Sequence, residues 1–130
     1  MPVERKVSPD LAPPPGYAHV ATAQGHRLVL TAGGVPLDPQ GNLVGEGDVA
    51  AQTRQVISNL IEQLWLGGAA PDDVLKTTVY VAAAENPDLV AAWNEVQASP
   101  LAPAASTLLG VACLGYSGQL VEIEAIAALE

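Results

Sequence analysis

Two stretches of the chain repeat apolar residues at the spacing of an amphipathic helix. Asp48 is a candidate N-cap for the first, and its apolar stripe comprises Val56, Ile57, Leu60, Ile61 and Leu64. Gly67 and Gly68 supply a stop for this helix. The second opens at Asn86 and Pro87, which we interpret as an N-cap followed by proline at the first helical position. Its buried stripe is predicted to be Leu89, Ala92, Trp93 and Val96.

Five or six other stretches favour β-strands, because β-branched or alternating apolar residues lie between glycine and proline breaks. They are residues 17–24, 26–32, 73–83, 106–112 and 120–129, with a further short strand near 43–44. Two helices among so many strands predict an α+β domain: a mixed five- or six-stranded sheet with both helices on one face. Residues 1–16 end in three prolines and a glycine and are expected to form an extended lead-in, which leaves 17–130 as one domain. The other face of the sheet, rich in Val, Leu and Ala, would need a cover.

The composition of the chain limits the binding partners and the cellular location that we expect. Apolar residues make up 49% of the 130 residues and charged ones 15%, which indicates that another subunit covers part of the surface. The net charge is −9, and no lysine or arginine follows Lys76, so the chain is not expected to bind nucleic acid or an anionic membrane. The single cysteine, Cys113, fits a reducing compartment. With no signal-peptide pattern and no apolar run long enough to span a bilayer, we expect a cytoplasmic protein.

The last predicted strand carries two acids on one face. Alternation along residues 120–127 places Glu122 and Glu124 beside Leu120 and Ile126. A carboxylate on a mostly apolar strand face is costly to bury without a partner. Two interpretations stay open: both acids are solvated or paired at a subunit interface, or one lines a cleft as a base that activates water.

Other candidates for chemistry are few. His19 and His26 are the only histidines and no neighbouring set completes a metal site, so neither a metal nor a cofactor is expected. Cys113 is expected to sit in an apolar strand as an inert core thiol. Gly33 and Gly34 allow either a turn or the close approach of a ligand to the backbone.

Several segments, in order, resemble the RidA (YjgF) family of enamine/imine deaminases, also called endoribonuclease L-PSP-like. They are PGY at 15–17, LTAGGVPLDPQGNLVGEGD at 30–48, QTRQVISNL at 52–60, KTTVYV at 76–81, WNEV at 93–96, LLGVACLG at 108–115 and VEIEAIA at 121–127. The resemblance implies a chorismate-mutase-like α+β subunit and a homotrimer with small-molecule clefts between subunits. A trimer would also cover the apolar sheet face.

The resemblance also implies which residues of this chain line the cleft. It implies Glu122 as the catalytic acid that positions water, with Tyr17, Gly33 and Asn94 binding the substrate. At the place of the family's carboxylate-binding arginine we align Ser106, and Ala32 replaces the family's serine. We add Tyr116 as a further substrate-binding candidate.

A hydroxyl is a poor substitute for a guanidinium that clamps a carboxylate, which argues against efficient deamination of 2-imino acids. Arg27, Arg54 or Lys76, from a neighbouring subunit, could supply the missing charge.

Two functions therefore compete. The first is a hydrolase in which Glu122 activates water against an imine, an enamine or a related substrate that the usual arginine does not hold. The alternative is a non-catalytic trimer that binds a small metabolite or a protein. Ribonuclease activity, the other role attached to the family, fits poorly with a net charge of −9.

Overall fold

Six strands and two α-helices make up the computed structural model, which describes residues 3–24 and 27–130. In chain order they are β1 (Val3–Lys6), β2 (Val20–Ala23), β3 (Arg27–Leu30), α1 (Val49–Leu66), β4 (Val74–Ala82), α2 (Asn86–Gln97), β5 (Ala105–Val111) and β6 (Val121–Leu129). A short 3₁₀ helix, Pro71–Asp73, leads into β4. None of the helices described here is long and apolar enough to cross a membrane.

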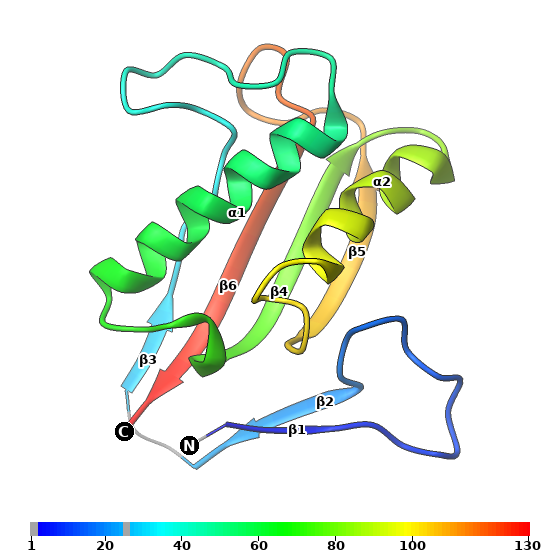
Figure 1. Ribbon diagram of the computed structural model, residues 1–130, viewed down its shortest axis with the longest axis vertical. Coiled ribbons are helices and arrows are strands. Elements are labelled where there is room, and N and C mark those ends of the chain that lie inside the picture. The colour runs from blue at the N-terminus through cyan, green and yellow to red at the C-terminus, as the bar shows by residue number, and fades with distance from the viewer. Residues whose placement is uncertain (1–2, 25–26) are drawn as a thin grey trace.

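The main sheet has four strands in the order β3-β6-β4-β5. β6 runs antiparallel to both β3 and β4, whereas β4 and β5 are parallel, so the sheet is mixed. β1 and β2 form a separate antiparallel pair, and a bridge between Ala18 and Ala105 joins their connection to the edge of β5. Both helices lie on the same face of the main sheet (Figure 1). The predicted α+β class, mixed sheet and helix placement are thereby confirmed.

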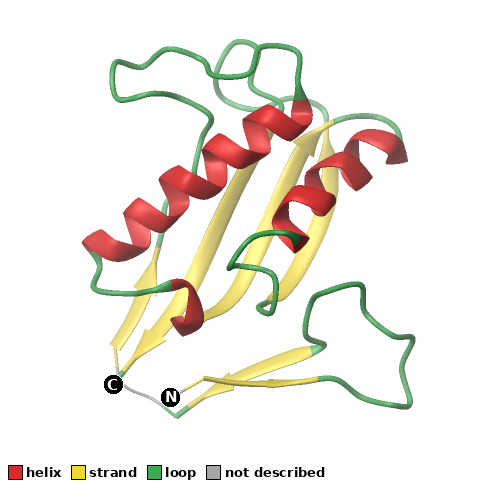
Figure 2. Cartoon of the chain, in the orientation of Figure 1, coloured by secondary structure: helices red, strands yellow, loops and turns green. Residues whose placement is uncertain are grey.

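The core lies between the helices and the main sheet. The apolar stripes predicted for the two helices face inward, and Val56, Leu60, Leu64, Ala92 and Val96 are fully buried. They pack on the inward residues of the two central strands: Val79, Val81, Val121, Ile123, Ala125 and Ala127. The Asp48 side chain accepts a hydrogen bond from the Ala51 amide at 3.0 Å, which confirms the predicted N-cap of α1. Figure 2 shows the helices as one layer over the strands.

The structure differs from the sequence prediction in four places. Residues 3–6, expected to be part of an extended lead-in, form a strand that pairs with β2. Helix α2 begins at Asn86 itself, with Glu85 as its N-cap. Near residue 43 there is a single bridge between Leu37 and Leu43 in place of a strand. Cys113 is exposed beyond the end of β5, because the strand stops at Val111; the prediction of a core thiol was wrong. Gly25, between the predicted strands 17–24 and 26–32, and His26, the predicted start of the second, lie outside the described residues.

The face of the main sheet opposite the helices, called the open face below, combines apolar and charged side chains. Leu28 and Leu30 of β3 are 61% and 67% exposed, and Ile126 beside them is 36% exposed. Polar residues of β4 and β6 continue this face: Lys76, Thr78, Tyr80, Glu122 and Glu124. The functional candidates therefore divide between the open face and the face covered by the helices.

Candidate functional site

Glu122 lies on the open face. On β6 its neighbours Val121 and Ile123 are fully buried toward the helices, whereas Glu122 is half-buried, as the alternation along this strand predicts. Its carboxylate lies directly over Gly33. A Cβ built on that glycine would fall inside contact distance of the carboxylate and only 2.5 Å from its Cδ. The space for the Glu122 side chain therefore exists because residue 33 has none.

Gln119 holds the Glu122 carboxylate in place. Its amide Nε2 donates to Glu122 Oε1 at 3.0 Å and to the Val121 carbonyl at 3.0 Å, while its Oε1 accepts from the Tyr116 amide at 3.1 Å. Gln119 is only 4% exposed, so its bonds are shielded from water. Gln119 was not among the site residues predicted from the sequence. The feature of the sequence that could have indicated it is an amide side chain three residues before Glu122.

A buried glutamine on α1 fixes the turn that carries Gln119. Gln52 is fully buried and donates through Nε2 to the carbonyls of Gly45 and Gly118, at 3.2 and 3.0 Å. Its Oε1 accepts from the Leu120 amide at 2.7 Å. These bonds tie the first turns of α1 to the start of β6.

Tyr80 is the cross-strand partner of Glu122. Its pKa is raised above the ordinary value of 10.0 by partial burial, by a hydrogen bond to Glu124, and by the charges of Glu124 and Glu122. The phenol therefore stays protonated and can donate a hydrogen bond. The open face thus offers two carboxylates and a hydroxyl within one section of strands β4 and β6.

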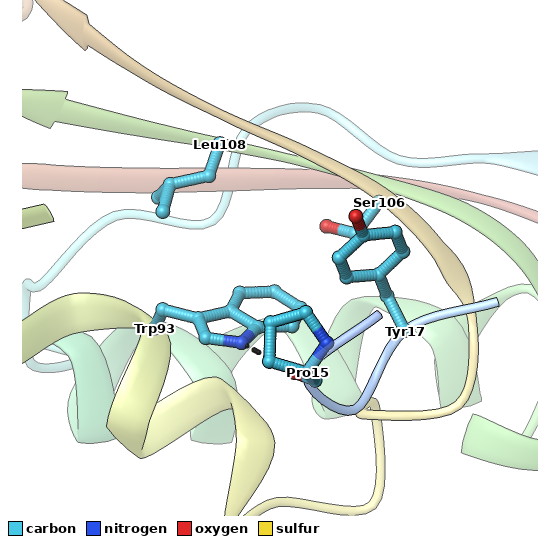
Figure 3. A pocket seen from close by; sticks show the side chains of 5 residues that line it. All are labelled: Pro15, Tyr17, Trp93, Ser106 and Leu108. Carbon is cyan, nitrogen blue, oxygen red and sulfur yellow. Dashed lines mark hydrogen bonds between the residues drawn. The ribbon is translucent and has the colours of Figure 1, made fainter. Parts of the chain in front are cut away.

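Tyr17 and Ser106 line a different pocket, on the helix-covered face. This pocket has a volume of about 260 Å³ and is lined by Pro15, Tyr17, Trp93, Ser106 and Leu108 (Figure 3). The rings of Tyr17 and Trp93 meet edge to face at 6.0 Å between centroids, and the indole nitrogen of Trp93 donates to the Pro15 carbonyl at 2.8 Å. Ser106 accepts a hydrogen bond from the buried hydroxyl of Thr77 at 2.8 Å.

Other predicted residues lie away from both groups or at their margin. Asn94 is exposed on α2, and Tyr116, which is 54% exposed, contributes its backbone amide to the Gln119 network. Arg54 forms an ion pair with Glu95 at 2.6 Å between the helices, and Arg27 stands in register with Leu129 at the edge strand. In residues 3–24 and 27–130, no group of three or more His, Cys, Asp or Glu side chains could hold a metal ion.

One copy of the chain does not bring all the predicted residues together. Glu122 and Gly33 meet on the open face, whereas Tyr17 and Ser106 meet behind the sheet. A site that uses both groups needs a second copy of the chain.

Comparison with known proteins shows to which family this chain belongs. The model of the endoribonuclease L-PSP family matches residues 9–129. The chain belongs to this family. It is 32% identical over 117 residues to a RutC family protein of Pyrococcus horikoshii, which covers 89% of this chain and 90% of that protein. The sequence resemblance to the RidA family is thereby confirmed at the level of the family.

Two further relatives bear on fold and function. A crystal structure of a Rid protein family member, YyfB from Yersinia pestis, superposes with a TM-score of 0.86 at 34% identity, covering 99% of this chain and 100% of that one. A 2-iminobutanoate/2-iminopropanoate deaminase of Salmonella typhimurium is 41% identical over 54 residues, which are 42% of this chain and 41% of that protein.

Proposed function

We propose that this chain is a cytoplasmic hydrolase of small imines or enamines that works as a homotrimer, with Glu122 as the base that activates water. One observation carries the proposal: a carboxylate fixed by a buried amide over a glycine that leaves it room. An acid held by a dedicated donor in a half-buried position is typical of a general base. The deaminase named among the relatives acts on imines, which supports this choice of substrate.

The reaction needs one base and one water. Glu122 takes a proton from the water as its oxygen attacks the carbon of the C=N bond, and then passes that proton to the nitrogen. The tetrahedral adduct then collapses to a C=O bond and releases ammonia, so an imine and water become a ketone and ammonia. The Tyr80 hydroxyl, kept protonated by its raised pKa, would exchange its hydrogen bond with Glu124 for one to the adduct.

The homotrimer is part of the proposal because one copy separates the candidate residues. The cleft between copies would join Glu122 and Gly33 of one subunit to Tyr17 and Asn94 of its neighbour. The exposed leucines of β3 support an interface there, since apolar side chains gathered on one sheet face mark a contact surface.

Analytical ultracentrifugation tests the assembly. We expect a species of three times the 13.3 kDa chain mass, which Leu30→Glu converts to smaller species while Leu66→Glu, at an exposed helix end, does not. A monomeric wild-type protein would refute the interfacial cleft.

Turnover by Glu122 is tested with freshly generated imines. An amino-acid oxidase produces 2-imino acids, and neutral imines are made from ketones and ammonia; ketone formation is followed with and without the protein. We expect acceleration by the wild type and loss of at least about a hundredfold in Glu122→Gln, the effect typical of a missing general base. Glu46→Gln, an acid in the loop before α1, is the matched control and should keep full activity. Equal rates with Glu122→Gln would refute the mechanism.

A non-catalytic binding protein is the second candidate, and the aromatic pocket favours it. Two aromatic rings beside a hydroxyl form a pocket of about 260 Å³ suited to a small, partly apolar molecule. If no imine is turned over and, in a Trp65→Phe variant, a ligand protects the remaining Trp93 fluorescence from quenching, this second function replaces the first.

A further inference from the structure

The positive charge on the open face comes from one residue. Among the described residues, Arg54 pairs with Glu95 between the helices, Arg5 donates to the carbonyls of Asp72 and Val74, and Lys6 lies beside Glu4 on β1. Arg27 begins β3 in register with Leu129 and alternates with Leu28, so it lies on the other face of the sheet. Lys76 of β4 projects on the open face, in register with Ile126 on one side and Ala105 on the other.

The ammonium group of Lys76 is held near the acids without being neutralised by them. Its Nζ donates to Thr107 Oγ1 at 2.6 Å, which uses one of its three N–H donors. Within the described part of the chain, no carboxylate lies within ion-pair distance of it. Partial burial lowers its pKa from the ordinary value of 10.5, as expected for a cation that lacks a neutralising partner.

The strand register gives the distance between the Lys76 ammonium and Glu122. Thr107 is the partner of Thr78, which is the partner of Glu124, so the tip of Lys76 reaches the level of Glu124 on the sheet. One further two-residue step along β6, about 7 Å, leads to Glu122. Across the sheet, β5 and β6 are separated by β4, about 10 Å in all.

The separation between the Lys76 ammonium and the Glu122 carboxylate has room for one small acid and one water molecule. A carboxylate bonded to Lys76, an imine carbon next to it and a water between that carbon and Glu122 together span roughly this distance, since each hydrogen bond covers about 2.8 Å. Lys76 also lines a pocket of about 140 Å³ with Thr78 and Glu124, whose apolar wall is Leu30 and Ile126. A short aliphatic chain on the ligand would pack against that wall.

We propose that Lys76 is the residue of the open face that binds the acidic group of the substrate. This inference rests on the proposed hydrolysis at Glu122 and specifies its substrate. It replaces the sequence-based expectation that Ser106 stands opposite the acid, because Ser106 lies on the other face of the sheet, bonded to Thr77.

Binding of an unreactive acid tests Lys76 apart from turnover. The probes are 2-hydroxybutanoate and its neutral amide, titrated calorimetrically into the wild-type protein and into Lys76→Met, Lys76→Arg and Glu122→Gln. We expect the acid to bind the wild type more tightly than the amide does, and Lys76→Met to weaken acid binding about 10- to 100-fold, the loss expected for one charged hydrogen bond. Affinity for the amide should not change.

The other variants serve as controls. Lys6→Met makes the same change of charge on β1, where Lys6 lies beside Glu4, and should bind the acid like the wild type. Lys76→Arg keeps the charge and should retain most of the affinity, and Lys76→Gln, a second neutral variant, should weaken acid binding as Lys76→Met does and repeats the test if Lys76→Met fails to fold. Glu122→Gln should bind the acid undiminished.

The outcomes separate the two proposals. If Glu122-dependent turnover of imino acids is found but the neutral variants Lys76→Met and Lys76→Gln bind acid and amide like the wild type, the role of Lys76 is refuted and the hydrolase stands. If acid binding depends on Lys76 but no imine is turned over, the hydrolase is refuted and the binding site stands. An acid that binds no better than its amide would overturn the inference directly.

Discussion

Replacing Gly33 by alanine moves the Glu122 carboxylate without removing it. The added Cβ would lie 2.5 Å from Cδ and 2.6 Å from Cγ of Glu122, well inside contact distance. Gly33 does not have a positive φ, so its backbone accepts alanine without strain. The half-buried Glu122 side chain must therefore rotate away, and its hydrogen bond from Gln119 is lost.

The two consequences differ greatly in size. A side chain forced off its rotamer costs about 0.5–1.5 kcal/mol, and the lost hydrogen bond about 1 kcal/mol. Replacing glycine by alanine restores about 0.4–1 kcal/mol through the unfolded chain. The net loss of stability is thus about 1 kcal/mol, a few degrees in Tm for a chain of this size. Displacing the base by about 1 Å is expected to lower turnover about a hundredfold.

Two measurements check this prediction: imine turnover and chemical denaturation. Gly115→Ala is the matched control, because no atom lies within 4 Å of its added Cβ and its φ is not positive. In a Glu122→Ala background, Gly33→Ala should cost no stability, since the obstructing side chain is gone. Full turnover in Gly33→Ala, or an undiminished loss of stability in the double variant, would refute the reasoning.

Three further predictions concern single contacts. Gln119→Leu should lower turnover at least tenfold and the free energy of unfolding by about 1–3 kcal/mol, measured by urea denaturation, because it leaves buried backbone groups unpaired. Glu124→Gln should lower the pKa of Tyr80 toward 10.0, since it removes a negative charge that disfavours the phenolate; an unchanged midpoint in an ultraviolet titration would contradict the assignment. Asp48→Ala should cost about 1 kcal/mol of unfolding free energy, and no loss would mean that the cap is dispensable.

Local patterns were sufficient for most of the fold. The stripe of α1 and its cap at Asp48 depend on contacts within a few turns, which the sequence displays directly. Strand β1 was missed because only Val3 among residues 3–6 is apolar, so they show no apolar alternation, and its partner strand begins at Val20, far along the chain. A strand stabilised by such distant pairing leaves little signal in its own residues.

The residues of the candidate site could likewise be predicted only in part. Alternation along β6 was enough to place Glu122 on the face away from the core. The contribution of Gln119 depends on how the turn before β6 folds back, which Gln52 determines from another element. The separation of Tyr17 and Ser106 from Glu122 by the sheet depends on the register of β4 and β5, which spacing along the chain does not reveal.

Charge on the open face favours one orientation of an acidic ligand. Glu122 and Glu124 repel a carboxylate, so the acid group must lie toward β5, where Lys76 is held by Thr107. An ammonium is a point charge on a flexible stem and does not impose the planar geometry of a guanidinium. Lys76 would therefore tolerate acids that differ in shape, and the wall of Leu30 and Ile126 would select among them by chain length. Discrimination in this protein would then depend more on apolar contact than on a rigid clamp, and each methylene would change affinity by about 1 kcal/mol.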